Sequence, residues 1–170
     1  MPFSKIKSYA KINLALNIVG KKSSLHKIES IVAFVDLYDD IFIKKIKSKK
    51  HKITFCGRFS KNIAKKNTIS KLLTVLEANK ILKDKKFQIK INKRIPNKAG
   101  LGGGSMNAAN ILKFFLKKNI IKITKKRVEK ISRLIGSDVI LGFNSTNTIL
   151  TSKDKIKQFP NCRKIHTLII

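Results

Sequence analysis

The sequence predicts an α+β fold, with an antiparallel or mixed sheet covered by helices on one side, from two kinds of periodic segment. Several segments alternate apolar and polar residues, which is typical of strands with one buried face. Others repeat apolar residues every three or four positions, which is typical of amphipathic helices. The 170 residues suffice for one compact domain. We expect it to span residues 1–150, with residues 151–170 forming a closing strand or the start of a truncated second domain.

The clearest alternation is "KINLALNIV" at residues 11–19. It predicts a strand whose buried face consists of Ile12, Leu14, Leu16 and Ile18. Further strands are predicted over residues 28–35, 40–46, 51–57 and 86–95. We expect a turn at Asp39 and Asp40 between two of these strands. We also expect Pro96 to end the last one, because proline cannot donate a hydrogen bond to a sheet.

Helices are predicted over residues 67–82, 105–119 and 124–136. Asn67 or Thr68 is the expected cap of the first helix, and Thr124 is the expected cap of the last. Gly136 is a typical residue to end a helix. The segments that follow are expected to form a closing hairpin over residues 138–143 and 147–151.

The chain is strongly basic, with 39 Lys and Arg against 9 Asp and Glu and a formal net charge of +30. Such a charge attracts nucleic acid, nucleotides or an anionic membrane surface. However, only five of the basic residues are arginine, which base recognition prefers, and the lysines are dispersed along the chain. A proteome rich in lysine is the simpler explanation. We therefore expect a small-molecule partner and regard nucleic acid as the weaker hypothesis.

Three observations bear on location. No apolar run approaches the ~20 residues that span a bilayer, and the N-terminus lacks the apolar core of a signal peptide. Cys56 and Cys162 have neither a CxxC partner nor histidines at metal spacing, so we expect free thiols and no cysteine-bound metal. These observations favour a cytoplasmic protein with no membrane partner.

The stretch "PNKAGLGGGSMN" at residues 96–107 is the strongest local signal, because four of the eight glycines lie within Gly100–Gly104. It follows a predicted strand and precedes a predicted helix, the order that exposes backbone N–H groups and a helix N-terminus to phosphate. It lacks the lysine of a Walker A loop and the buried parallel strand of a Rossmann fold, and it opens a helix, unlike a protein-kinase loop. A tight helix start without a ligand is the alternative.

Four segments together resemble the GHMP kinases, which include galactokinase, homoserine kinase and mevalonate kinase. "IPNKAGLGGGSMNAA" resembles their ATP loop, and "SYAKINLALNIVG" resembles an N-terminal strand of the superfamily. "LHKIESIVAFVDLYD" and "IGSDV" resemble two further motifs in the same order. Within the superfamily, the chain is most similar to the kinases of a cytidine-diphosphate-linked sugar alcohol. That resemblance implies an α+β domain of the type that the superfamily shares with a ribosomal protein.

The resemblance implies that the γ-phosphate of ATP is transferred to the 2-hydroxyl of that sugar alcohol, in the synthesis of isoprenoid precursors. It puts the catalytic base at Asp138 and its cationic partner at Lys11. A lysine beside an aspartate can stabilise charge on the transferring group. Taken alone, the two residues read more simply as a turn aspartate and a solvated lysine at a strand edge.

The resemblance also implies ligand contacts. Asn13 and His26 would lie near the substrate, although His26 alone reads equally well as a loop histidine. Mg²⁺ would accompany ATP, with Ser105 as a candidate contact and no carboxylate ligand evident. The ATP site would comprise Pro96, Asn97, Lys98, Ala99, Gly100, Leu101, Gly102, Gly103, Gly104, Ser105 and Met106.

Members of the superfamily carry a second, C-terminal domain that closes the cleft. The resemblance covers only the N-terminal domain, so a further domain or a second chain is expected to complete the site. Two alternatives stay open. The chain could be an inactive fragment that keeps its affinity for nucleotides, or a basic RNA-binding module of related fold.

Overall fold

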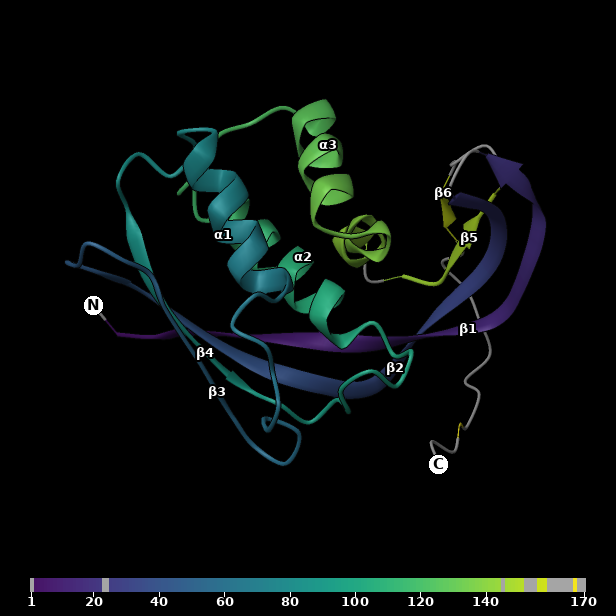
Figure 1. Ribbon diagram of the computed structural model, residues 1–170, viewed down its shortest axis with the longest axis horizontal. Helices are drawn as coiled ribbons and strands as arrows, with labels where there is room; N and C mark the ends of the chain where they lie inside the picture. The colour runs from purple at the N-terminus through teal and green to yellow at the C-terminus, as the bar shows by residue number, and fades with distance from the viewer. Residues whose placement is uncertain (1, 23–24, 145, 152–155, 159–166, 168–170) are drawn as a thin grey trace.

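The computed structural model describes residues 2–22, 25–144, 146–151, 156–158 and 167. In these residues, one six-stranded mixed sheet is covered on one face by three α-helices and a 3-10 helix (Figure 1). The predicted α+β architecture is therefore confirmed. The boundary that we placed at residue 150 stays a prediction. Cys162 lies outside the described residues, as does most of the apolar run at the end of the chain.

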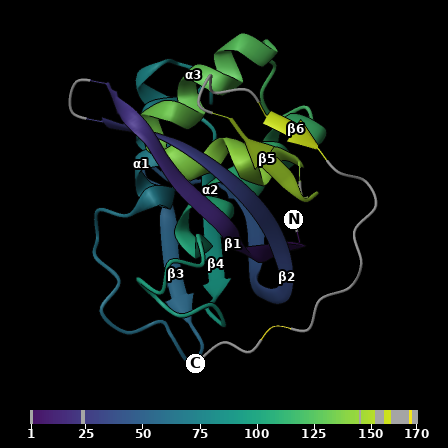
Figure 2. The same cartoon turned by 90° about the vertical axis from the view of Figure 1, so that its right-hand side faces the viewer.

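Two long antiparallel strands, β1 (Ser4–Lys22) and β2 (Leu25–Ile46), form a curved ribbon that organises the sheet (Figures 1 and 2). β2 is shared by several partners, because its second half pairs with β4 (Lys86–Asn92) and its first half pairs with β5 (Thr148–Leu150). The remaining strands are β3 (Lys52–Cys56), parallel to β4, and β6 (Ile156–Gln158), antiparallel to β5.

β2 runs without interruption through Asp39 and Asp40, so the predicted turn at these residues is wrong. Both acids are buried, at 0% and 2% exposure. Lys5 Nζ and Arg94 Nη2 each lie 3.0 Å from a carboxylate oxygen of Asp40. Two adjacent acids are typical of a turn, and their cationic partners come from distant segments. Nothing in the local sequence therefore reveals that the acids are compensated.

The predicted buried face of residues 11–19 is also wrong for most of its length. Leu14 and Leu16 are each 49% exposed and Ile18 is 64% exposed, whereas Lys11 is only 7% exposed. Three register shifts between β1 and β2 interrupt the strict alternation from which that face was predicted. In addition, this end of the ribbon extends beyond α2, so no helix covers it (Figure 1).

The three α-helices lie where the periodicity predicted them, and two of the predicted caps are confirmed. Asn67 accepts hydrogen bonds from the backbone N–H groups of Ile69 and Ser70, and Thr124 accepts one from Arg127. Gly136 ends the last helix, as predicted. The helices are α1 (Thr68–Ala78), α2 (Gly103–Lys117) and α3 (Lys125–Ile135).

The strand predicted over residues 138–143 is wrong, because this segment lies in the 3-10 helix η1 (Ser137–Asn144). A short apolar run does not distinguish a strand from a buried helical turn. Gly142 fits η1 closely against α2, since a Cβ atom there would lie only 2.5 Å from Ala109 Cβ. The second half of the predicted hairpin is confirmed as β5.

The main core lies between the helices and the inner face of the sheet. Phe87 of β4 and Phe115 of α2 meet at its centre, with 4.7 Å between their ring centroids. Burying an aliphatic or aromatic side chain contributes about 1.5–3 kcal/mol, so this layer is the main source of stability. Fully buried members from α1, α2, β2 and β4 include Leu72, Leu76, Ile41, Ile43, Ile89, Ile91, Ile111 and Leu112.

His51 connects three elements at the edge of this core. Its Nδ1 accepts a hydrogen bond from the backbone N–H of Phe87 at 3.0 Å, and its Nε2 lies 3.1 Å from Glu77 Oε1. Burial lowers the pKa of His51 from its ordinary value of 6.5. A hydrogen bond from Lys86 lowers the pKa of Glu77 from its ordinary value of 4.5. Both groups therefore bind protons less readily in the folded chain.

Acidification should weaken the fold first through His51. Since its pKa is lower in the folded than in the unfolded chain, the unfolded chain takes up more protons, and stability is lost as the pH falls below about 6.5. Glutamine at position 51 can accept from Phe87 N–H but does not titrate. His51→Gln should therefore lose less thermal stability than the parent between about pH 7.5 and about pH 5.5. Equal losses in thermal unfolding experiments on the two proteins would contradict this assignment.

Candidate active site

Lys11 lies on β1 at the point where the strand leaves regular pairing with β2. A register shift falls between Tyr9 and Ala10, and the backbone N–H of Lys11 donates to Leu101 O at 3.0 Å. Its ammonium Nζ donates to Asn13 Oδ1 at 2.8 Å and lies 3.2 Å from Asp138 Oδ2. Next to this bulge, the backbone N–H of Lys11 therefore bonds to the glycine loop, and its side chain reaches Asp138.

Asp138 reaches this lysine from η1, directly after the end of α3 at Gly136. Its side chain is 34% exposed, whereas that of Lys11 is 8% exposed. Ser137 Oγ donates to Asp138 Oδ1 at 3.3 Å. The pair therefore presents a carboxylate to solvent with a buried ammonium behind it. The structure brings together the two residues predicted to be catalytic, and Lys11 is buried, unlike the solvated lysine of the simpler interpretation.

α2 begins at the glycines themselves, two residues before the predicted start. Gly102 is its N-cap in the left-handed conformation, with φ of 67°, and Met106 N–H donates to Gly102 O at 2.9 Å. The N–H groups of residues 103–105 form the first turn, where a helix has no carbonyl partners of its own and favours an anion. Ser105 lies inside this turn and does not cap the helix.

Close packing explains much of the glycine content. A Cβ atom at Gly102 would lie 2.8 Å from Lys11 Cγ, and one at Gly103 would lie 2.9 Å from Ile95 Cγ2. At Gly104 it would lie 3.0 Å from Thr68 Oγ1, whose hydroxyl donates to Gly104 O. Gly100 faces open space and has φ of 72°, so only its conformation favours glycine. The triplet thus lets the helix start approach β1, α1 and the segment that follows β4.

The start of α2 also lies beside the segment that carries Asp138. A Cβ atom at Gly136 would lie 3.7 Å from Ser105 Oγ, so the serine hydroxyl faces the junction of α3 and η1. Lys11, Asp138 and the first turn of α2 therefore converge, although 127 residues separate the first two in the sequence. A hydroxyl, a carboxylate, an ammonium and free backbone N–H groups in one place suit a phosphate and a reacting hydroxyl.

The remaining predicted site residues lie further from the contact between Lys11 and Asp138. His26 pairs with Lys21 near the end of the ribbon, eight residues along β2 from Phe34, the partner of Lys11. At ~3.3 Å per residue, this separation is about 26 Å along the strand. The side chain of His26 lies outside the described residues. In the loop, Asn97 Nδ2 donates to Phe59 O at 2.6 Å, while Lys98 and Ala99 are exposed.

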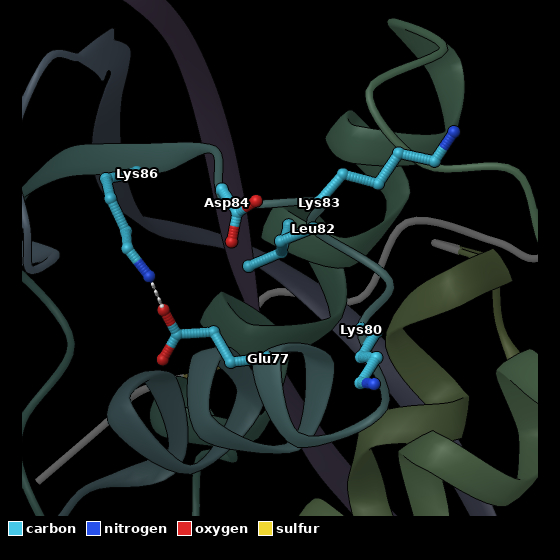
Figure 3. A pocket seen from close by; sticks show the side chains of 6 residues that line it. All are labelled: Glu77, Lys80, Leu82, Lys83, Asp84 and Lys86. Atoms are coloured by element: carbon cyan, nitrogen blue, oxygen red, sulfur yellow. Dashed lines mark hydrogen bonds and ion pairs between the residues drawn. The ribbon is translucent and has the colours of Figure 1, made fainter.

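Two hollows accompany these elements. One, of about 620 Å³, lies between the end of α1 and the start of β4, where Glu77 and Lys86 point towards each other (Figure 3). None of the predicted site residues lines it. A smaller hollow adjoins the glycine loop, and sequence reasoning did not predict it. The residues lining this smaller hollow are Phe55, Ile63, Asn67, Thr68, Ile69, Lys93, Asn97, Gly104 and Asn107.

Sequence reasoning also missed a buried polar cluster under the loop, the Asp39 cluster, which comprises Asp39, Lys93 and Asn107. The three side chains lie on β2, directly after β4, and on α2, at 0%, 3% and 1% exposure. Lys93 Nζ and Asn107 Nδ2 both donate to Asp39 Oδ2. The only local signal was the occurrence of these polar residues within largely apolar segments. Their contact spans 68 positions of the sequence, from Asp39 to Asn107.

Comparison with known proteins gives a consistent result. The family model "GHMP kinases N terminal domain" matches residues 62–149. The chain is 60% identical over 165 residues to a 4-diphosphocytidyl-2-C-methyl-D-erythritol kinase of Pelagibacter ubique, a match that covers 97% of this chain and 59% of that protein. It is 35% identical over 136 residues to the kinase of the same name from Clostridium beijerinckii, covering 79% and 48% of the two chains.

The fold comparison agrees with the family match. A crystal structure of 4-(cytidine 5'-diphospho)-2C-methyl-D-erythritol kinase superposes with a TM-score of 0.73 at 22% identity, covering 92% of this chain and 55% of that one. A galactokinase of Lactococcus lactis superposes with a TM-score of 0.61 at 13% identity, covering 93% and 47%. The chain thus spans about half to three-fifths of the length of these relatives.

Substituting alanine for Gly100 and for Gly102 should separate the cost of left-handed backbone strain from the cost of a steric clash with Lys11. Both Gly100 and Gly102 have positive φ, so each substitution carries about 1–2 kcal/mol of left-handed strain. Only at Gly102 does the new methyl group meet the Lys11 side chain, which adds about 1–3 kcal/mol of overpacking. Denaturant unfolding should therefore show the larger loss of stability for Gly102→Ala. Losses of equal size would contradict close packing of Lys11 against the loop.

Proposed function

The chain belongs to the GHMP kinases, and on that premise we propose that it is the ATP-binding part of a 4-diphosphocytidyl-2-C-methyl-D-erythritol kinase. The proposed reaction transfers the γ-phosphate of ATP to the 2-hydroxyl of that compound, a step in isoprenoid synthesis by the non-mevalonate route. Identity of 60% to a relative with this name supports the proposal. Because the chain matches only 59% of that relative, catalysis by this chain alone is part of what must be tested.

The observation that carries the proposal is the contact between Lys11 and Asp138, with 3.2 Å between Nζ and Oδ2. Phosphoryl transfer requires positioned reactants, neutralised charge and an acceptor for the hydroxyl proton. The exposed Asp138 carboxylate is suited to take that proton. Lys11 has three N–H donors, of which Asn13 and Asp138 use two. Among the contacts of the described residues, one donor is left for an oxygen of the transferring phosphate.

The first turn of α2 is the proposed seat of the ATP phosphates. Its backbone N–H groups at residues 103–105 point out of the helix start, where the helix dipole favours negative charge. The close packing of the glycines holds this turn against Lys11 and Thr68. Asn97 and Gly104 also line the small hollow that adjoins the loop.

The residues present fit a magnesium ion that accompanies ATP. Mg²⁺ takes oxygen ligands and keeps several waters, so one or two protein oxygens suffice beside the phosphates. Ser105 Oγ in the first turn of α2 is the candidate in this chain. When bound, the ion would neutralise charge on the phosphates. Removal of divalent ions should weaken nucleotide binding.

The substrate side of the site is less complete. Asn13, whose Oδ1 is engaged by Lys11, and His26 are the proposed contacts to the cytidine-linked sugar alcohol. We propose that a further domain or a second chain closes the cleft, since relatives extend well beyond the matched region.

No helix in the described residues is long and apolar enough to cross a membrane. A cytoplasmic location stays a prediction.

Asp138→Asn should abolish phosphoryl transfer while leaving nucleotide affinity nearly intact. Asparagine keeps the shape of the side chain but cannot accept the proton, so we expect turnover to fall by about 10²–10⁴-fold. Turnover is measured with 4-diphosphocytidyl-2-C-methyl-D-erythritol and ATP, and affinity is measured by titration calorimetry with a non-hydrolysable ATP analogue. The assay is run on this chain alone and on a fusion with the unmatched C-terminal part of the Pelagibacter ubique relative.

Asp84→Asn is the matched control, because Asp84 is an exposed acid in the turn before β4 and lines the remote hollow of Figure 3. It should leave turnover unchanged. Turnover by the fusion but not by the chain alone would assign the missing function to the second domain. Equal turnover of Asp138→Asn and the parent would refute the assignment of the base. Failure of the parent fusion to phosphorylate the substrate would refute the proposed reaction.

A further inference from the structure

We propose that Asp39 is a positioning residue, whose carboxylate clamps together the two ends of the glycine loop and so sets the start of α2 for phosphate binding. The inference rests on the proposed function in so far as phosphate is the ligand. Asp39 lies in the middle of β2, opposite Ser8 of β1, and is fully buried. We expect it to act through the loop backbone and not by touching the nucleotide.

One carboxylate oxygen of Asp39 accepts hydrogen bonds from the chain before the loop, and the other accepts one from the helix after it. Asp39 Oδ1 accepts hydrogen bonds from the backbone N–H groups of Arg94 at 2.8 Å and Ile95 at 2.9 Å, just before the loop begins at Pro96. Asp39 Oδ2 accepts one from Asn107 Nδ2 at 2.8 Å, in the second turn of α2. One side chain from a distant strand therefore joins the chain before the loop to the helix after it.

A charged group suits this position because it must hold several donors at once. An ionised carboxylate is purely an acceptor with about four lone-pair sites, and here four donors approach it. Lys93 is the fourth, and its ammonium also balances the buried charge. That ammonium lies directly under the helix start, since a Cβ atom at Gly103 would lie 3.3 Å from Lys93 Nζ. Each partner thus constrains the same few backbone positions.

The intervening loop needs such a constraint. Residues 97–100 are exposed, and Lys98, Gly100 and Gly102 all have positive φ. Glycine-rich backbone has many accessible conformations, and ordering it on ligand binding costs affinity. Holding both ends at a fixed separation removes part of that cost before the ligand arrives. The clamp therefore predicts that the backbone N–H groups bonded to the loop, those of Lys11 and Met106, are protected even in the free protein.

The test uses Asn107→Leu, which keeps a similar side-chain volume but removes the bond to α2. Asp39 itself is a poor target, because its replacement leaves the buried Lys93 charge unpaired and endangers folding. Three quantities are measured: thermal stability, affinity for a non-hydrolysable ATP analogue with Mg²⁺, and loop exchange, which is the hydrogen exchange of the Lys11 and Met106 amides bonded to carbonyls of the loop. We expect loop exchange to be about tenfold faster and affinity to be about tenfold weaker, the effect of losing one charge-assisted bond.

Leu82→Ala is the control for general destabilisation. Leu82 is 1% exposed and lines the remote hollow between α1 and β4, so its truncation lowers thermal stability without touching the loop. It should leave loop exchange and analogue affinity close to those of the parent.

Asn107→Leu with parental loop exchange would overturn the clamp, as would Leu82→Ala with an equal change in the loop. Failure of the parent to bind the analogue would count against the proposed function. In that case hydrogen exchange, which needs no ligand, still decides the inference about Asp39.

Discussion

The buried ion pair between Asp39 and Lys93 is the constraint on which the geometry of the site depends. It lies where β2, the end of β4 and α2 meet, and it cannot be removed one charge at a time without a large penalty. Because its carboxylate also holds two backbone amides, the chain leaves β4 in one direction. That direction brings the glycine loop over Lys11, and from there α2 runs back across the sheet.

The arrangement of the proposed catalytic pair, Lys11 and Asp138, follows from this path of the chain. The loop contacts Lys11 through its backbone. Leu101 O accepts a hydrogen bond from the backbone N–H of Lys11, and Gly102 lies against the aliphatic part of the lysine side chain. The ammonium is thereby left facing Asp138, which η1 brings from the other side. In a chain with 39 basic residues, the position of this particular lysine depends on buried contacts and not on net charge.

Sequence reasoning succeeded where the information was local. The helices carry their own apolar stripes, and caps such as Asn67 and Thr124 are read from one or two residues. The resemblance to a known superfamily placed Lys11 and Asp138 in one site, and the structure brings them into contact. Periodicity alone could not have done so, because their proximity depends on a bulge, a loop and a 3-10 helix.

Most of the errors have the opposite cause, since they depend on partners distant in the sequence. Asp39 and Asp40 resemble a turn until Lys93, Arg94 and Lys5 are placed beside them. The apolar alternation of residues 11–19 predicted burial, but register shifts and the extension of the ribbon beyond α2 leave it exposed. The glycine triplet was attributed to ligand access, whereas close packing against Lys11, Ile95 and Thr68 accounts for it equally.

The contact of Gly102 with Lys11 has an evolutionary consequence. As long as lysine occupies position 11, any side chain at position 102 collides with it, so substitutions at the two sites are not independent. A smaller residue at position 11 would relieve the collision with a side chain at 102, although the left-handed strain at 102 would remain. Substitutions at Gly102 and Lys11 are therefore expected to be coupled in evolution, although 91 positions of the sequence separate the two residues.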